Sequence, residues 1–319
     1  MEPAPQWHDV DALRRHVLSF LSPSEILRLS VLNRSFRTAA ACVADIGLVA
    51  STPMNTDLDH IARFFRGARR LELAQCYLPM DHLQPLTTFA LVQSVVLTDV
   101  VFLQDSHLLT LTCTARNLVS LSVTNCHLLS HVQLLGGQKL TYVAFERNMN
   151  LKTLEIRGAN VDEAPVVREL RVVGSATFQH ADELTQMLPA LKTASFAECG
   201  MLSHFVLPSS HPSLESLDFR RCSVLLVVDV HAPHLRVLAL KGALQLTHLG
   251  VASECLEKLD AAMLFHLQSV AVDCPALVTL NLTGCNRMES SNLRLHCPHL
   301  KRFKVHSTSS LSVGDYVNA

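Results

Sequence analysis

The chain has 319 residues, of which 49% are hydrophobic and 17% charged, and its formal net charge at pH 7 is -1. It carries no run of basic residues, so we expect neither a nucleic acid nor an anionic membrane surface as a partner. Its apolar stretches are too short to span a bilayer and no secretory signal pattern opens it, so we expect a cytoplasmic protein, a nuclear one, or both, with free thiols.

The first forty residues carry a helical pattern. Leu13, Val17 and Leu21 are spaced to share one face of a helix. Ser22-Pro23 then predicts a stop and a restart, because serine caps helices and proline suits their first turn. A third short helix is predicted around Phe36. Three short helices bury little apolar surface among themselves, so residues 1–45 are expected to pack on something else.

From residue 68 onward the pattern Leu-x-x-Leu-x-Leu recurs. The step between successive copies is 21 residues from Leu256 to Leu277 and 27 residues from Leu140 to Val167. This period is typical of leucine-rich repeats, in which each turn buries its apolar face only by stacking on its neighbours. About eleven turns are predicted, each with an inner strand, starting at Ala68, Val92, Leu118, Leu140, Val167, Leu191, Leu214, Leu235, Leu256, Leu277 and Leu300.

A second apolar pattern lies eleven residues after most of these starts. Leu246-x-x-Leu249-x-Val251 is one example, and it predicts extended structure on the outer side of the turns as well. Residues 178–188 are an exception with helical spacing. Around Met288 the outer pattern fits a strand poorly, so an irregularity is expected there. The fold class is therefore α+β: a short helical segment over residues 1–45 and a repeat solenoid over 46–319.

The cysteines follow the repeat instead of forming a cluster. Eight residues after most starts stands a small residue, for example Cys199, Cys222 or Ala243, and a proline often stands two residues before the next start. Cysteine at such a corner behaves as a small buried group. A zinc site needs ligands that converge in space, and nucleophilic catalysis needs a base beside the nucleophile. We therefore predict no metal, no cofactor and no catalytic residue.

The segment HVLSFLSPSEILRLSVLNRSF, residues 16–36, resembles an F-box. The matching parts are Val17-Leu18-Ser19-Phe20-Leu21-Ser22-Pro23 and Glu25-Ile26-Leu27-Arg28-Leu29. Asp9-Val10 stands where that family has Leu-Pro, and Asn33 and Phe36 stand at its late Cys and Trp. The run from Cys274 to Cys285 is similar to the cysteine-containing leucine-rich repeats that often follow an F-box.

The resemblance implies a substrate-recognition subunit of an SCF-type E3 ubiquitin ligase, which is not itself an enzyme. The F-box would bind a Skp-type adaptor, and through it a cullin, while the repeats hold a protein substrate. The residues implied in adaptor binding are Leu13, Val17, Leu18, Phe20, Leu21, Pro23, Ile26, Leu27, Leu29, Leu32 and Phe36. Two alternatives remain open: the helices only cap the end of the solenoid, or the chain is a protein-interaction scaffold outside the ubiquitin system.

Charged residues at exposed strand positions are the candidates for substrate binding. They form a mixed ladder, in which the doublet Arg220-Arg221 and the neighbouring Lys241 suit an acidic or phosphorylated segment. The same ladder is also compatible with a merely solvated face. The candidates are Glu146, Arg147, Arg157, Arg171, Arg220, Arg221, Lys241 and Lys304.

Overall fold

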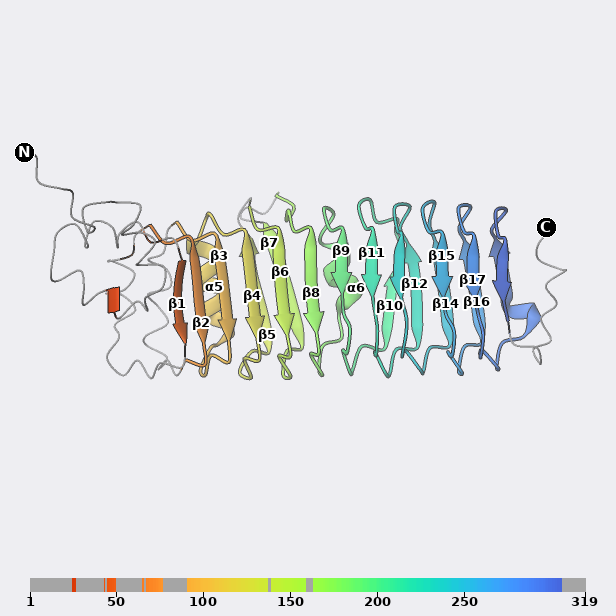
Figure 1. The fold of residues 1–319 in the computed structure, drawn as a ribbon, viewed down its shortest axis with the longest axis horizontal. Helices are drawn as coiled ribbons and strands as arrows, with labels where there is room; N and C mark the ends of the chain where they lie inside the picture. Colours follow the sequence, from red (N-terminus) through yellow and green to blue (C-terminus); the bar gives the residue numbers. More distant parts are fainter. Residues whose placement is uncertain are drawn as a thin grey trace, which may run out of the picture.

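The computed structural model describes residues 25–26, 43, 45–49, 65, 67–76, 91–136, 139–158 and 163–305. In this part the chain winds into a solenoid whose successive turns stack side by side along one axis (Figure 1). All strand pairs in it are parallel and join one turn to the next, as between β11 and β13. No helix of the described residues is both long enough and apolar enough to cross a membrane.

One side of the solenoid, the inner wall, is made of strands that follow the predicted starts. Its first nine strands form one sheet and the last three form another. Every predicted inner strand is present, so this prediction is confirmed, and β1 is an addition that the repeat pattern did not reveal. The strands are β1 (Asp45–Val49), β2 (Arg70–Ala74), β3 (Ser94–Thr98), β4 (Ser120–Thr124), β6 (Tyr142–Glu146), β8 (Glu169–Val173), β9 (Thr193–Ser195), β11 (Ser216–Asp218), β13 (Val237–Ala239), β15 (Lys258–Asp260), β17 (Thr279–Asn281) and β19 (Arg302–Lys304).

The opposite side, the outer wall, is also mostly extended, as the second apolar pattern predicts. Its strands form a pair and a five-stranded sheet. The helix expected within residues 178–188 is present as α6, and the irregularity near Met288 is a 3-10 helix. The elements are α5 (Asp105–Thr114), β5 (His131–Gly136), β7 (Thr153–Gly158), α6 (Ala181–Gln186), β10 (His204–Leu207), β12 (Val227–His231), β14 (His248–Ala252), β16 (Ser269–Asp273), η4 (Ser290–Asn292) and β18 (Leu293–His296).

Helix α5 was not anticipated. Its ten residues rise about 15 Å at 1.5 Å per residue, which matches the roughly 17 Å covered by five strand residues. A helix can therefore replace an outer strand where the turn has residues to spare. The turn from Val92 to Leu118 has 26 residues, against 21 for the turns that begin at Leu235 and Leu256.

The core lies between the two walls. Leucines at the repeat positions, such as Leu217 and Leu280, are fully buried, and parallel pairing places each directly above its equivalent in the next turn. Where the two walls meet in the middle of the stack, the rings of Phe196, Phe205 and Phe219 lie 4.8 to 6.0 Å apart. The repeated apolar rows thus become one continuous core.

The corner after each inner strand has a constant geometry. A residue with positive φ stands there in turn after turn, for example Arg147, Glu198, Arg221 and Met263. The next residue is buried, and in several turns its side chain bonds to the preceding turn: the thiol of Cys222 donates to the Phe196 carbonyl oxygen at 3.0 Å. The prediction that the cysteines are buried corner residues is confirmed for this position.

Candidate interaction surfaces

The inner wall is hollowed where β8, β9, β11 and β13 end. The hollow has a volume of about 510 Å³, which lies within the range of ligand-binding clefts. Alternation along each strand turns one set of side chains outward, and the parallel register stacks these sets into rows. Four basic and two acidic side chains are among the lining residues, which are Arg171, Val173, Ser195, Ala197, Glu198, Asp218, Arg220, Arg221, Lys241 and Gly242.

The arginines of this hollow are held by carboxylates. Arg220 Nη2 lies 2.7 Å from Asp218 Oδ2, and Arg221 Nη1 lies 2.9 Å from Glu198 Oε1 on the preceding turn. Arg171 Nη2 lies 3.1 Å from an oxygen of Glu146. These pairs are largely exposed, so each contributes little to stability, but each places a carboxylate beside a guanidinium group of the hollow.

Asp218 is the anchor of this arrangement. Burial alone would raise the pKa of its carboxyl group, but hydrogen bonds from the Arg220 guanidinium, from the Arg220 backbone N–H and from the Ser195 hydroxyl hold that pKa below its usual value. The hydrogen bond to Asp218 in turn raises the pKa of Arg220. The carboxylate and the guanidinium are therefore both charged at neutral pH.

Lys241 differs from the arginines. Among the described residues its ammonium group has no hydrogen bond and no ion pair. It follows β13, beside the Arg220–Arg221 doublet of the previous turn, so the hollow has an excess of positive charge with one uncommitted cation. Such a site suits a carboxylate or phosphate group on a partner.

The structure gathers some of the predicted substrate-binding residues and separates others. Arg171, Arg220, Arg221 and Lys241 line one hollow, and Glu146 reaches it through its ion pair with Arg171. Arg157 lies on the outer wall, in β7, where it pairs with Glu155. Lys304 lies in β19, at the far end of the inner wall. Arg147 occupies the left-handed corner position after β6.

Sequence reasoning missed Glu198 and Ser195 as parts of the hollow. Both stand at the same offsets from their repeat start, Leu191, as Arg221 and Asp218 do from Leu214. When the turns are aligned by their repeat starts, Glu198 falls in the row of Arg221 and Ser195 in the row of Asp218.

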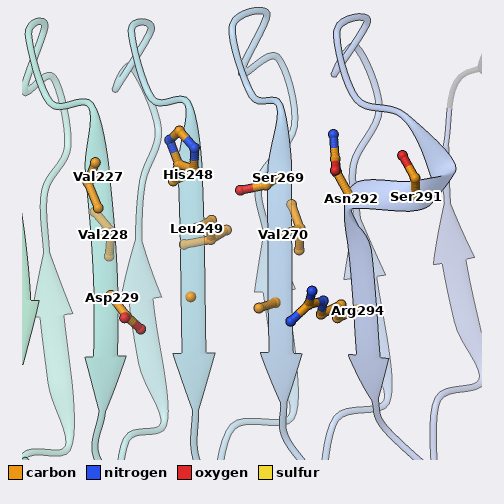
Figure 2. A pocket seen from close by; sticks show the side chains of 12 residues that line it. Val227, Val228, Asp229, His248, Leu249, Ser269, Val270, Ser291, Asn292 and Arg294 are labelled. Atoms are coloured by element: carbon orange, nitrogen blue, oxygen red, sulfur yellow. The ribbon is translucent and has the colours of Figure 1, made fainter. Parts of the chain in front are cut away.

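A second hollow lies on the outer wall and has no counterpart in the sequence-based expectations. It crosses β12, β14, β16 and the start of β18, with a volume of about 520 Å³. In Figure 2, the side chains of Asp229 and Arg294 lean toward one another from opposite sides of it. We call it the outer trough; it is lined by Val227, Val228, Asp229, His248, Leu249, Gly250, Ser269, Val270, Ala271, Ser291, Asn292 and Arg294.

Of the residues implied in adaptor binding, only Ile26 lies among the described residues. It is helical, 3% exposed and part of the hydrophobic core cluster. The others (Leu13, Val17, Leu18, Phe20, Leu21, Pro23, Leu27, Leu29, Leu32 and Phe36) lie outside the described residues.

The cysteines remain spread along the solenoid. No group of three or more His, Cys, Asp or Glu side chains within the described ranges is placed to hold a metal ion. Burial raises the pKa of the Cys222 thiol to about 12 and that of the Cys285 thiol to about 11. These thiols are neutral at physiological pH, as hydrogen-bond donors to the backbone must be.

Comparison with known proteins adds a general likeness. No protein-family model matches the chain, and no curated protein matches it. Among solved structures, the leucine-rich repeat domain of the type III effector XCV3220 (XopL) is 16% identical, with a TM-score of 0.44, over 94% of this chain and 99% of that one. Rad7, from a structure of the Rad7 and Elc1 complex in yeast, is 14% identical, with a TM-score of 0.34, over 84% of this chain and 77% of that one.

The chain is a solenoid of the leucine-rich-repeat kind. That description rests on its own repeats and on its parallel strand pairing.

Proposed function

We propose that this chain is a substrate-recognition subunit of an SCF-type ubiquitin ligase. Residues 1–45 would bind a Skp-type adaptor, and through it a cullin, while the solenoid binds a protein substrate through the charged hollow of the inner wall. The subunit would contribute proximity and orientation and leave the bond-making steps to other subunits.

The observation that carries the substrate-binding part is the convergence of four basic side chains from separate turns on one hollow. Three of them are already oriented by carboxylates, so little side-chain freedom is lost when a partner binds. The adaptor-binding part rests on the F-box resemblance and on its position ahead of the repeats.

The adaptor part is tested by capture of a purified Skp-type adaptor on the full chain. Leu18→Asp should abolish capture, because a charge at an F-box contact has to be desolvated on binding. Leu128→Asp is the matched control, since Leu128 is 51% exposed at a corner of the solenoid, and it should leave capture unchanged. Failure of the unmodified chain to capture the adaptor refutes this part.

The substrate part is tested by reversing the charge of the uncommitted cation and its neighbours. Arg220→Glu, Arg221→Glu and Lys241→Glu together should remove a set of acidic or phosphorylated proteins from those that bind the chain in cells, as measured by affinity purification and mass spectrometry. Arg157→Glu with Lys304→Glu is the control, because neither residue lines the hollow. An unchanged set of bound proteins would exclude the hollow as the substrate site.

A second candidate function is a protein-interaction scaffold outside the ubiquitin system. The burial of Ile26 favours it, because a side chain that is already buried within the chain is not free to contact an adaptor. In that case the charged hollow would still bind a partner, but the full chain would not capture the adaptor.

A further inference from the structure

The outer trough holds two opposite charges, those of Asp229 and Arg294. Among the described residues, neither the carboxylate of Asp229 nor the guanidinium of Arg294 makes a hydrogen bond or an ion pair. In the inner hollow, by contrast, each arginine already holds a carboxylate. A partner can therefore engage Asp229 and Arg294 without first breaking an existing contact.

The floor between these two charges is made of very small residues. The register aligns Asp229 with Gly250, Gly250 with Ala271, and Ala271 with Arg294. A Cβ atom at Gly250 would collide with Asp229 Oδ1, so the absence of a side chain there is what lets the carboxylate lie over β14. The next residue in the row, Ala271, is exposed. The row is thus open to a side chain from outside at Ala271, next to the carboxylate that covers Gly250.

The spacing of this row fits an extended polypeptide that crosses the strands. Three strand steps of about 4.8 Å separate the Cα atoms of Asp229 and Arg294 by about 14 Å. In an extended segment, residues i and i+4 face the same way and lie about 13 Å apart, with residue i+2 between them. Such a segment presents residue i to Asp229, residue i+2 to the middle of the row and residue i+4 to Arg294.

We infer that the outer trough binds a short extended segment of a partner protein that carries a basic side chain and an acidic side chain four residues apart. The basic side chain pairs with Asp229 and the acidic one with Arg294, while the side chain midway between them packs on Ala271. This surface is on the opposite wall from the charged hollow, and the inference does not depend on the proposed function.

The ends of the trough support this assignment. At one end the 3-10 helix η4 brings Ser291 and Asn292 to the rim, as Figure 2 shows, and these side chains can bond the backbone of a crossing segment. Along one side run His248 and Ser269, and along the other run further polar residues, His231, Asp273 and His296. The result is a small apolar floor with a polar rim, which is the usual arrangement of a protein-binding patch.

The inference is tested with a display library of random, linear heptapeptides selected on the full chain. Enriched peptides should carry Lys or Arg and Asp or Glu four positions apart. On the variant Asp229→Arg, Arg294→Asp the selection should enrich the opposite charge order, and each selected peptide should bind the other protein about tenfold more weakly by fluorescence anisotropy.

Two further variants separate a blocked trough from a damaged fold. Ala271→Tyr should abolish peptide binding by filling the floor, whereas Val237→Tyr, at a 53% exposed strand position of the inner wall, should not. Circular dichroism and thermal unfolding should be alike for the two variants. Peptides without the charge pattern, selection that does not change with the charge swap, or no enrichment at all would overturn the inference. So would self-association of the chain that Ala271→Tyr abolishes, since the occupant would then be a second copy.

Discussion

At the scale of single residues, the corner after each inner strand shows how the chain joins one turn to the next. Cys199 and Cys285 donate thiol hydrogen bonds to carbonyl oxygens of the preceding turn, at 3.1 and 3.2 Å. Asn148 occupies the same position and does more. It accepts a hydrogen bond from the Cys126 N–H at 2.8 Å and donates one to the Val123 carbonyl at 2.9 Å. The position thus accepts different small or apolar buried residues, such as Ala243, and a donor there can bond to the preceding turn.

We predict that Asn148→Ala lowers the free energy of unfolding by about 2 to 4 kcal/mol, because it leaves a buried N–H and a buried carbonyl without partners. Asn148→Cys should cost less, since a thiol restores one of the two bonds. The control is Asn150→Ala, which removes only an exposed bond to the His127 carbonyl and should cost less than about 1 kcal/mol. Urea unfolding measures all three, and equal losses for Asn148→Ala and Asn150→Ala would contradict this account.

The sequence predicted the burial of this corner but not the partners of its hydrogen bonds. Cys199, Asn148 and Ala243 share one offset from their repeat starts, which is enough to infer a small buried group. Which carbonyl receives each bond depends on how one turn sits on the previous one. That relation involves residues more than twenty positions apart and has no local signal.

At the scale of elements, the outer wall of the described solenoid contains strands, two helices and a 3-10 helix. Each type of element fits there because each can bury apolar side chains against the core. Leu249 in β14 is 1% exposed, whereas Leu244, at the corner before the same strand, is 47% exposed. The two leucines are five residues apart in one turn, so they test how much of the stability comes from burial alone.

Leu249→Ala should lower the free energy of unfolding by about 2 to 5 kcal/mol, through lost burial and a cavity between the walls. Leu244→Ala should change it by less than about 0.5 kcal/mol. Chemical denaturation followed by circular dichroism distinguishes them. If both substitutions lower the free energy of unfolding equally, Leu244 contributes more to stability than its exposure indicates, and this account is wrong.

Element type followed from the spacing of apolar residues where that spacing was regular. The helical exception around Leu184 and the irregularity near Met288 were both predicted, since each breaks the strand period. Helix α5 was missed because its buried residues, Leu108, Leu111 and Thr112, form too narrow a stripe to be distinguished from a loop.

The outer trough was missed for another reason. Asp229, Gly250 and Ala271 are separated by two steps of 21 residues, and that equality is the signal that places them in one row. Arg294 follows after 23 residues, because η4 intervenes. Only the strand register shows that it belongs to the same row.

At the scale of the whole molecule, each turn contacts only its neighbours. The stability of a turn is then its own contribution plus that of two interfaces, and a turn at an end of the described stack has lost one of them. Opening from an end therefore costs less free energy than opening in the middle.

Hydrogen exchange should reveal this gradient. Backbone amides of β9 and β11, in the middle of the described stack, should exchange more slowly than those of β17 and β19, near its C-terminal end. Exchange followed by mass spectrometry of peptic peptides measures it. Equal protection throughout would indicate a single cooperative unit, and Leu217→Ala in β11 should then accelerate exchange everywhere instead of in the adjoining turns alone.

Both walls are mostly extended, and in Figure 1 the turns follow one another along one axis. Within each sheet, parallel pairing sets neighbouring strands at a constant spacing, so the rows of side chains on it keep a constant pitch. The separation of two groups in a row is therefore set by the number of turns between them, at about 4.8 Å per turn. Inserting one 21-residue turn, the length from Leu235 to Leu256, would preserve every local contact and still move two recognition points out of step with a partner. In such a protein, specificity is encoded in turn number as much as in side-chain chemistry.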